Sequence, residues 1–386
     1  MSELPRTTEV AIIGGGVIGL AVARALSLRG VRDVLLIERG SLGAESSGAA
    51  AGMLAPQAEA NCADDFFHLC RRSRDLYPAF AAELREETGI DIQLETTGTL
   101  YLGLNEQDAN ELDLRYQWQS ESGLTVERLS AEAVKKIEPS VSEDVLMALK
   151  FPLDSQVENR RLVEALATSN RDRGVGLATD TSVNSLRLSR GKIAGLETSR
   201  GFVATERVVI AAGAWSSEVG LTNSSVGSPD SALPSLGIEP VRGQMLCFET
   251  KLFSHVIYTP RGYVVPRRDG RLLAGSTTEH VGFVKRVTDA GIKSIQSAAR
   301  EISPGIGSLL LSESWAGLRP RTPDGLPVLG TYAEIEGLFY ATGHYRNGIL
   351  LAPITGELIA GVVVDSVSPV ALDAFAPDRF DRVCVG

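Results

Sequence analysis

The sequence predicts an α/β fold with a central parallel sheet, joined to an α+β region that contains an antiparallel sheet. The first part rests on "TEVAIIGGGVIGLAVARALSLRG" (8–30), which has the order apolar strand, glycine turn and apolar helix. The run "VLLIE" (34–38) follows and predicts a second buried strand. The antiparallel sheet is predicted by residues 240–280, where short apolar runs are separated by turns, including a hairpin turn at Asp269 and Gly270.

The remaining elements follow from the spacing of apolar residues along the chain. Residues 64–89 and 161–174 predict helices, 97–104 predict a strand, and 105–150 predict helices of a smaller domain. Residues 183–213 alternate strands with glycine turns and end in a buried strand that runs into Ala212 and Gly213. The Ser/Pro/Gly-rich stretch 221–237 predicts a loop or a domain crossing. A strand at 337–343 and a helix from about Asn347 complete the expected fold.

The composition is that of an ordinary globular protein with an acidic balance. Of 386 residues, 44% are hydrophobic and 22% charged, and the formal net charge of −10 argues against nucleic acid or an anionic membrane as partner. The apolar run 10–28 is broken by glycines and by Arg24, so we expect neither a signal peptide nor stable membrane insertion. The four cysteines form no CxxC pair and the four histidines have no metal-ligand spacing. We therefore expect buried free thiols, no metal and a cytoplasmic location.

Gly14, Gly16 and Gly19 form a GxGxxG motif between the first strand and its helix. Glycines at this spacing allow the tight turn, the close approach of a pyrophosphate and the packing of helix on strand. Glu38 ends the next strand, where its carboxylate can accept hydrogen bonds from a ribose diol. This combination predicts a dinucleotide site but does not separate NAD from FAD.

Two distant segments favour FAD. "RVVIAAGAWS" (207–216) predicts another strand ending in small residues, and "LFYATGHYRNG" (338–348) predicts a third. An NAD site mostly needs one continuous βαβ unit, whereas a flavin reaches further and needs pieces from both ends of the chain. The positive end of a helix that starts near Asn347 would face the flavin and favour its reduction, because reduced flavin carries negative charge.

Six segments resemble the D-amino acid oxidase family of FAD-dependent oxidoreductases, and most closely its glycine oxidases of thiamine biosynthesis. They are "IIGGGVIGL" (12–20), "SSGAAAGMLAPQAEA" (46–60), "RSRDLYPAFAAEL" (72–84), "GYVVPR" (262–267), "SWAGLRPRTPDGLPVLG" (314–330) and "GHYRNGILLAPITGELIA" (343–360). The resemblance implies non-covalent FAD, and no cysteine lies between Cys247 and Cys384 for the covalent attachment that sarcosine oxidases use. It also implies two interleaved domains, an FAD-binding domain at 1–90, 150–228 and 316–386 and a substrate-binding domain at 91–149 and 229–315.

Carried over position by position, the resemblance assigns three residues to catalysis. Arg319 pairs with the substrate carboxylate, which a guanidinium fork can hold bidentately, and Tyr263 and Arg346 lie at the same site. The chain departs from the common pattern at Arg321, where glycine is frequent, and at Tyr345, where phenylalanine is frequent. The residues expected to bind FAD are Gly14, Gly16, Val17, Ile18, Gly19, Glu38, Arg39, Ser46, Ser47, Gly52, Met53, Leu54, Val183, Ala212, Gly213, Arg319, His344, Arg346, Asn347, Gly348, Ile349 and Leu350.

Simpler structural roles compete with some of these assignments. Arg319 is alternatively part of a structural salt bridge at a strand end, and Tyr263 an ordinary sheet tyrosine. Glu279 is expected in a solvated loop. Arg267 and Arg268, beside the predicted hairpin turn, are expected to be solvated.

The resemblance implies oxidative deamination of glycine, and of small amines such as sarcosine, to an imine with reduction of O2 to H2O2. The imine would feed thiazole synthesis for thiamine, and we expect a homo-oligomer. Alternatives within the family are a glycine or D-amino acid dehydrogenase that passes electrons to a quinone or other carrier, and a sarcosine-type oxidase. Alternatives from outside this family are a nicotinamide dehydrogenase and a non-catalytic flavin-binding module. A tRNA-modifying flavoenzyme is disfavoured by the acidic composition.

Overall fold

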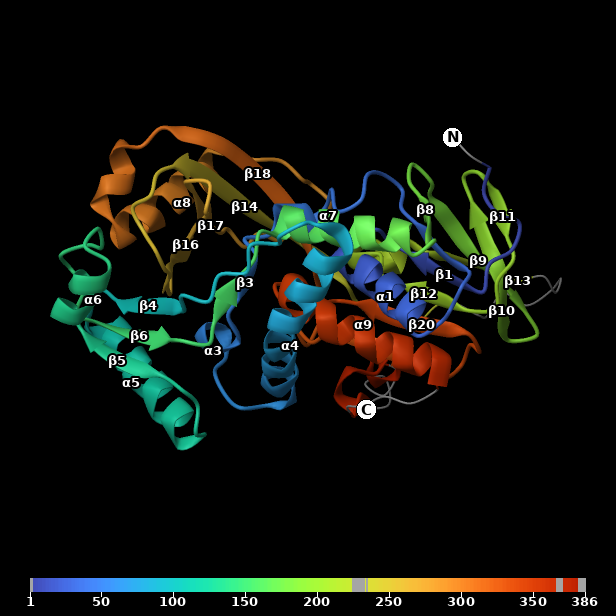
Figure 1. The fold of residues 1–386 in the computed structure, drawn as a ribbon, viewed down its shortest axis with the longest axis horizontal. Coiled ribbons are helices and arrows are strands. Elements are labelled where there is room, and N and C mark those ends of the chain that lie inside the picture. The colour runs from blue at the N-terminus through green and yellow to red at the C-terminus, as the bar shows by residue number, and fades with distance from the viewer. Residues whose placement is uncertain (1–2, 224–232, 234, 366–370, 381–386) are drawn as a thin grey trace.

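The computed structural model describes residues 3–223, 233, 235–365 and 371–380, and two large sheets organise them (Figure 1). One sheet is mainly parallel and lies beside helices α1, α4, α7 and α9. The other is mainly antiparallel and lies at the opposite end of the long axis. This arrangement confirms the predicted fold class.

The mainly parallel sheet has six strands in the order β19-β20-β12-β1-β2-β8. Only its edge pair, β19 and β20, is antiparallel. The strands β1, β2, β12 and β20 are buried along their whole length, which explains why their sequences are continuous apolar runs. The six strands are β1 (Val10–Ile13), β2 (Val34–Ile37), β8 (Gly176–Ala178), β12 (Val208–Ile210), β19 (Val328–Thr331) and β20 (Leu338–Thr342).

Four helices cover one face of this sheet and form the larger core cluster with it. Asp64 caps the longest of them by accepting a hydrogen bond from Phe67 N–H (2.8 Å), and Gly89 ends it with a φ of 73°. A Cβ at Gly356 would lie 2.8 Å from the Ala21 carbonyl oxygen, so the glycine lets two of these helices cross closely. The four are α1 (Val17–Leu28), α4 (Asp65–Thr88), α7 (Asn159–Asp172) and α9 (Gly348–Asp365).

Helix α9 is long and apolar enough to cross a membrane, but 72% of it is buried inside the protein. In Figure 1 it lies alongside α1, and it also packs against α4. Its apolar composition is therefore accounted for by the core. The apolar N-terminal run forms β1, a glycine turn and α1, as predicted.

A small sheet covers the other face of the parallel sheet, and the two share a second core cluster. Its strand order is β11-β10-β9-β13. Its strands are β9 (Val183–Ser189), β10 (Lys192–Thr198), β11 (Gly201–Val203) and β13 (Gly220–Asn223). The prediction of a loop at 221–237 was wrong for residues 221–223, which belong to β13, and most of the remaining stretch lies outside the described residues.

The second large sheet has eight strands in the order β18-β14-β17-β16-β15-β4-β6-β5, antiparallel except between β15 and β4. The predicted hairpin joins β16 to β17. Residues 105–150 contain two strands as well as helices, so the expectation of helices alone was wrong. The elements of this half are β4 (Thr99–Gly103), α5 (Glu106–Glu121), β5 (Glu127–Ser130), α6 (Ala131–Ile137), β6 (Met147–Phe151), β14 (Glu239–Glu249), β15 (Val256–Thr259), β16 (Gly262–Pro266), β17 (Arg271–Gly275), α8 (Asp289–Ile302) and β18 (Leu311–Arg321).

Short elements connect the halves and complete the chain. In the connection, β3 pairs antiparallel with β7. The predicted domain boundaries stay a prediction, and the one at 228/229 lies outside the described residues. The short elements are α2 (Ser46–Ala49), β3 (Met53–Leu54), α3 (Pro56–Glu59), β7 (Ser155–Gln156) and the 3-10 helices η1 (Gly213–Glu218), η2 (Pro304–Ser308), η3 (Asp373–Phe375) and η4 (Pro377–Arg379).

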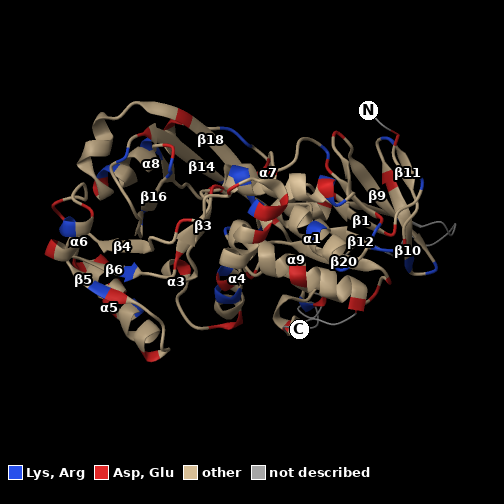
Figure 2. Cartoon of the chain, viewed as in Figure 1, with Lys and Arg blue, Asp and Glu red and all other residues tan. Residues whose placement is uncertain are grey.

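The central strands of the parallel sheet carry no charge, and two of the three described cysteines are buried. Figure 2 shows β1, β12 and β20 free of charge, whereas α5 and its neighbour β5 carry both signs. Cys70 and Cys247 are buried free thiols, as expected. Cys62 is exposed, so the expectation of burial was wrong there, because it lies in the polar turn before α4. Cys384 lies outside the described residues.

Candidate active site

A cavity of about 370 Å³ lies where the elements of both halves meet. Its wall is formed by the ends of β1, β2, β12 and β20, by the α2–β3 connection and by the start of α9. Strands β14, β16 and β18 of the antiparallel sheet contribute the remaining side. Segments from both ends of the chain therefore converge on one cavity, as a flavin site requires.

The GxGxxG glycines bring backbone close to backbone at one end of this cavity. Gly14 has a φ of 113°, and a Cβ there would collide with the carbonyl oxygen of Ala211. A Cβ at Gly19 would collide with the Gly14 carbonyl oxygen, so Gly19 serves the packing of α1 on the turn. The N-terminus of α1 consequently lies at the cavity, where its N–H groups and dipole favour an anion such as pyrophosphate.

Glu38 is held in place on the cavity wall. Its Oε2 accepts a hydrogen bond from Gly15 N–H (2.7 Å) and its Oε1 accepts one from Gly40 N–H (2.9 Å). An ionised carboxylate has about four lone-pair sites, so about two remain for a ribose diol. The anchored carboxylate fits the predicted cofactor.

Gly52 and Met53 line the cavity on the side that faces the antiparallel sheet. Gly52 has a φ of 71°, and a Cβ there would collide with the carbonyl oxygen of Val157. Val157 N–H donates in turn to the Gly52 carbonyl oxygen (2.9 Å). This close pairing fixes the backbone that passes along the predicted flavin site.

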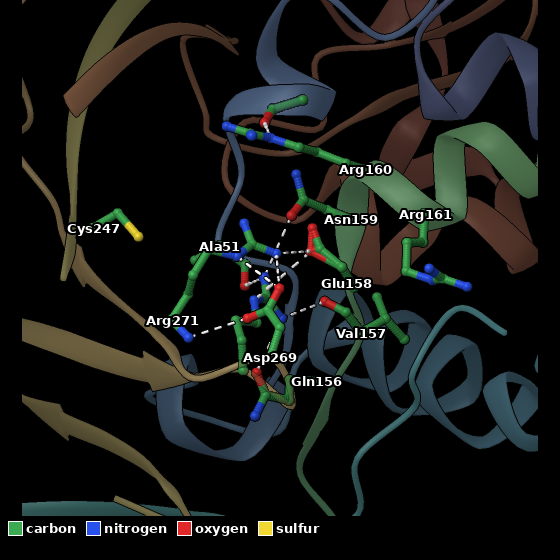
Figure 3. Close-up of polar contacts among 12 residues, drawn as sticks. Ala51, Gln156, Val157, Glu158, Asn159, Arg160, Arg161, Cys247, Asp269 and Arg271 are labelled. Atoms are coloured by element: carbon green, nitrogen blue, oxygen red, sulfur yellow. Dashed lines mark hydrogen bonds and ion pairs between the residues drawn. The ribbon is translucent and has the colours of Figure 1, made fainter. Parts of the chain in front are cut away.

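Arg267 holds the same stretch of backbone in place by hydrogen bonds to the carbonyl oxygens of Ala51 and Val157. It is buried, so the expectation that it is solvated was wrong, whereas Arg268 is exposed as expected. Burial lowers the pKa of Arg267 to about 10, and four acceptors bind its guanidinium group. Figure 3 labels the four residues that carry them. These acceptors are Gln156 Oε1 (3.1 Å), Val157 O (2.7 Å), Ala51 O (2.7 Å) and Asn159 Oδ1 (3.3 Å).

The C-terminal segment of the site ends a buried strand and starts α9. His344 is buried, its Nε2 lies 3.0 Å from Thr355 Oγ1, and burial lowers its pKa to about 3, so the imidazole is neutral at pH 7. Asn347, Gly348 and Ile349 line the cavity, so the first turn of α9 faces it. The helix dipole there would stabilise negative charge on a bound ring system.

Arg319 lines the cavity, and in the described part of the chain its guanidinium group is hydrogen-bonded only to uncharged acceptors. Its terminal nitrogens donate to Thr277 O (3.0 Å) and Ser276 Oγ (2.8 Å), and no ion pair within the described residues includes it. Burial lowers its pKa, and the neighbouring charge of Arg346 acts in the same direction. The alternative of a structural salt bridge therefore finds no support among these contacts. An uncompensated guanidinium at a cavity wall suits a ligand carboxylate.

Tyr263 also lines the cavity, and its hydroxyl has only a weak partner. The hydroxyl lies 3.5 Å from Met245 Sδ, and a thioether is a poor acceptor. The ring stacks on Tyr258, with centroids 5.8 Å apart and an interplanar angle of 20°. Tyr263 lines the same cavity as Arg319 and is among the groups whose charge acts on Arg319.

Arg346 differs from Arg319 because a carboxylate already neutralises it. Its Nη2 donates to Glu59 Oε1 (3.2 Å) and to the Tyr258 hydroxyl (3.2 Å). Glu59 raises the pKa of Arg346, and both side chains line the cavity.

Nearly all of the predicted site residues line this one cavity. Three do not: Gly19 packs against the turn, and Leu54 and Leu350 lie in the core beside it. Arg321 lies outside the cavity wall and pairs with Glu239 (2.7 Å). The structure thus brings the predicted residues together, while their individual roles stay predictions.

Glu279 is not the solvated loop residue that was expected. It pairs with Arg242 and accepts hydrogen bonds from Gln244 Nε2 (2.6 Å) and Thr277 Oγ1 (2.5 Å). Partial burial opposes ionisation, but these partners lower the pKa of Glu279 to about 2. Because Thr277 also binds Arg319, this network supports the predicted carboxylate anchor.

Some residues that shape the cavity were not predicted from the sequence. Trp215 lies under the Arg39 guanidinium, 3.6 Å from the ring centroid, and both line the wall. Glu59 stands in the segment 46–60 that carried the family resemblance, so that segment was the available signal. Among the described residues, no group of three His, Cys, Asp or Glu side chains could hold a metal ion.

Comparisons with known proteins agree with this geometry. The model of the family described as "FAD dependent oxidoreductase" matches residues 9–362. The chain is 39% identical to glycine oxidase of Geobacillus kaustophilus over 92% of each chain. The crystal structure of glycine oxidase from that organism has a TM-score of 0.90 at 37% identity, covering 97% of this chain and 99% of that one. The chain is 36% identical to the bifunctional protein ThiO/ThiG of Trichormus variabilis, covering 97% of this chain but 56% of that protein.

Proposed function

This chain belongs to the family of FAD-dependent oxidoreductases, and from that premise we propose that it oxidises glycine, and small amines such as sarcosine, to the corresponding imine. The observation that carries the proposal is the uncompensated guanidinium of Arg319 on the wall of a cavity that Tyr263 also lines. Bound FAD would supply the redox chemistry, accepting a hydride equivalent from the α-carbon and passing the electrons to O2, which becomes H2O2.

Residues of the parallel-sheet half would hold the cofactor. The N-terminus of α1 would receive the pyrophosphate, and Glu38 would accept hydrogen bonds from a ribose. Gly52 and Met53 would lie along one side of the ring system and the first turn of α9 along another. The collisions that a Cβ would cause at Gly14 and Gly52 support this assignment, since both positions keep backbone close to the cavity.

The residues at the substrate end orient and bind rather than transfer protons. Arg319 would hold the carboxylate through its free N–H groups, and Tyr263 would donate its hydroxyl to the same group. His344 is neutral and bonded to Thr355, and Glu59 is bonded to Arg346, so neither is placed as a free general base. The substrate amine would therefore have to be neutral before its α-carbon is oxidised.

The fate of the product and the setting of the enzyme are also proposals. We propose that the imine feeds thiazole synthesis, which the similarity to a bifunctional ThiO/ThiG protein supports. A cytoplasmic location and a homo-oligomeric state are proposed with it, on the basis of the glycine oxidases that the chain resembles.

The product balance in air tests the proposal. Purified protein supplied with glycine should yield H2O2 and ammonia in equal amounts, and sarcosine should yield methylamine in place of ammonia. A dehydrogenase would instead form little H2O2 with either substrate and would rapidly reduce an added artificial quinone. That second pattern would reject the oxidase and favour the alternative electron acceptor.

A further inference from the structure

The two guanidinium groups in the cavity have opposite electrostatic surroundings. Arg319 donates to a carbonyl and a hydroxyl, both neutral. Arg346 donates to the Glu59 carboxylate (3.2 Å) and to the hydroxyl of Tyr258 (3.2 Å). The cavity thus holds two cations and one anion at this end, and the anion is bonded to only one of the cations.

The Glu59–Arg346 pair is partly enclosed and faces the cavity. The side chains of Glu59 and Arg346 are 21% and 25% exposed, and both belong to the cavity wall. A pair in such surroundings interacts more strongly than one in open solvent, because water screens it less. It therefore presents a nearly neutral surface to an incoming ligand, and Arg319 remains the uncompensated cation.

We propose that Glu59 is a specificity-determining residue that limits the substrate to one anionic group. A single carboxylate binds to Arg319, while a second carboxylate near Arg346 would meet the negative charge of Glu59. This inference rests on the proposed function, because it assigns the substrate class of the same site. It predicts selection for amino acids with one carboxylate and against amines that carry two.

Among the residues that the structure describes, three other glutamates line the wall, Glu38, Glu45 and Glu218, but Glu59 is the carboxylate that raises the pKa of Arg346. Glu38 is bonded to Gly15 and Gly40 N–H at the α1 end of the cavity. Glu45 is bonded to Lys285 (2.8 Å) and Arg39 (3.2 Å). Removal of the Glu59 charge alone should consequently release the second cation.

The substitution Glu59→Gln tests this directly, because glutamine keeps the size of the side chain and an acceptor oxygen for Arg346. The test pair is glycine and iminodiacetate, which is glycine with a second carboxymethyl group on its nitrogen. In the FAD-loaded protein, Glu59→Gln should raise kcat/KM for iminodiacetate relative to glycine by about tenfold or more, the scale of a close charge pair. The gain should appear mainly in KM, because the new contact is made already in the bound substrate.

A binding measurement avoids dependence on turnover. Acetate and malonate, with one and two carboxylates, are titrated into the FAD-loaded protein and followed by the flavin absorption spectrum. Glu59→Gln should tighten malonate relative to acetate by about tenfold, and Glu59→Asp, which keeps the charge, should restore the wild-type ratio. Glu83→Gln is the control for loss of a carboxylate outside the cavity wall, where Glu83 pairs with Arg24 (3.0 Å), and it should change neither ratio.

The outcomes separate this inference from the proposed function. If glycine leaves the flavin of the wild-type protein oxidised, the proposed function fails, whereas the acetate and malonate ratio still tests Glu59. If glycine is oxidised normally but Glu59→Gln leaves both ratios at the wild-type value, the inference is overturned. Equal tightening of acetate and malonate would also overturn it, because Glu59 would then act on anions in general.

Discussion

Replacement of Arg319 by methionine should remove most of the affinity for the substrate carboxylate. A guanidinium carries five N–H donors, and Arg319 uses one from each terminal nitrogen for Thr277 O and Ser276 Oγ. Each terminal nitrogen therefore retains one N–H for a carboxylate. Loss of this contact in a poorly solvated cavity should cost about 2–5 kcal/mol in transition-state binding. That corresponds to a loss of about thirtyfold to several thousandfold in kcat/KM.

The assay is anaerobic bleaching of the flavin by glycine at increasing concentration. Arg319→Met should lose affinity for glycine, whereas oxidation of methylamine, which lacks a carboxylate, should be nearly unchanged. Arg321→Met is the matched control, because Arg321 lies on the same strand but outside the cavity wall and pairs with Glu239. Wild-type affinity and rate in Arg319→Met, with normal FAD content, would refute the assignment of the carboxylate anchor.

Three further predictions concern the cofactor and the fold. Glu38→Ala should weaken FAD retention, measured by ultrafiltration, and unchanged retention would leave Glu38 with a structural role only. Arg267→Met removes the partner of four buried acceptors and should lower the free energy of unfolding in urea by about 3–5 kcal/mol. Arg268→Met in the same hairpin should lower it by no more than about 1 kcal/mol, and similar losses in both variants would contradict the special role of Arg267. Partial burial raises the pKa of Glu87, but hydrogen bonds from Arg24, Arg173 and Ser169 outweigh this effect and lower the pKa from 4.5 to about 2. Because the pKa of Glu87 is lower in the folded than in the unfolded state, its ionised carboxylate stabilises the fold above pH 4.5 by roughly 1–2 kcal/mol, a value reduced by solvent screening. This stabilisation is lost as the pH falls towards 2. Glu87→Gln should therefore flatten that part of the curve of unfolding free energy against pH.

The elements that were predictable from sequence are those whose pattern is local. The run 8–30 combines apolar periodicity with glycines whose lack of a Cβ is required by backbone contact, as Gly14 shows. Helix α4 carries its own signals, with Asp64 as N-cap and Gly89 in a left-handed conformation. Such residues determine local structure wherever the segment lies, so the sequence alone reveals them.

The misassigned residues are those whose environment depends on distant segments. Arg267 lies beside a hairpin turn, where a solvated side chain is expected. Its acceptors, however, are Gln156 in β7, Asn159 in α7 and Ala51 in the loop before β3. The ion pair between Glu59 and Arg346 joins residues 287 positions apart. No periodicity or turn signal encodes such pairs, because burial and charge compensation arise only after the halves of the chain have packed together.

Anaerobic mixing of the FAD-loaded protein with glycine, followed by admission of air, tests whether glycine is the substrate and O2 the electron acceptor. Glycine should bleach the flavin absorption without added carrier, and air should restore the colour with one H2O2 formed for each flavin reoxidised. Flavin that stays oxidised in the presence of saturating glycine would contradict the assignment of substrate. Flavin that is bleached by glycine but stays reduced in air would contradict the assignment of O2 as electron acceptor.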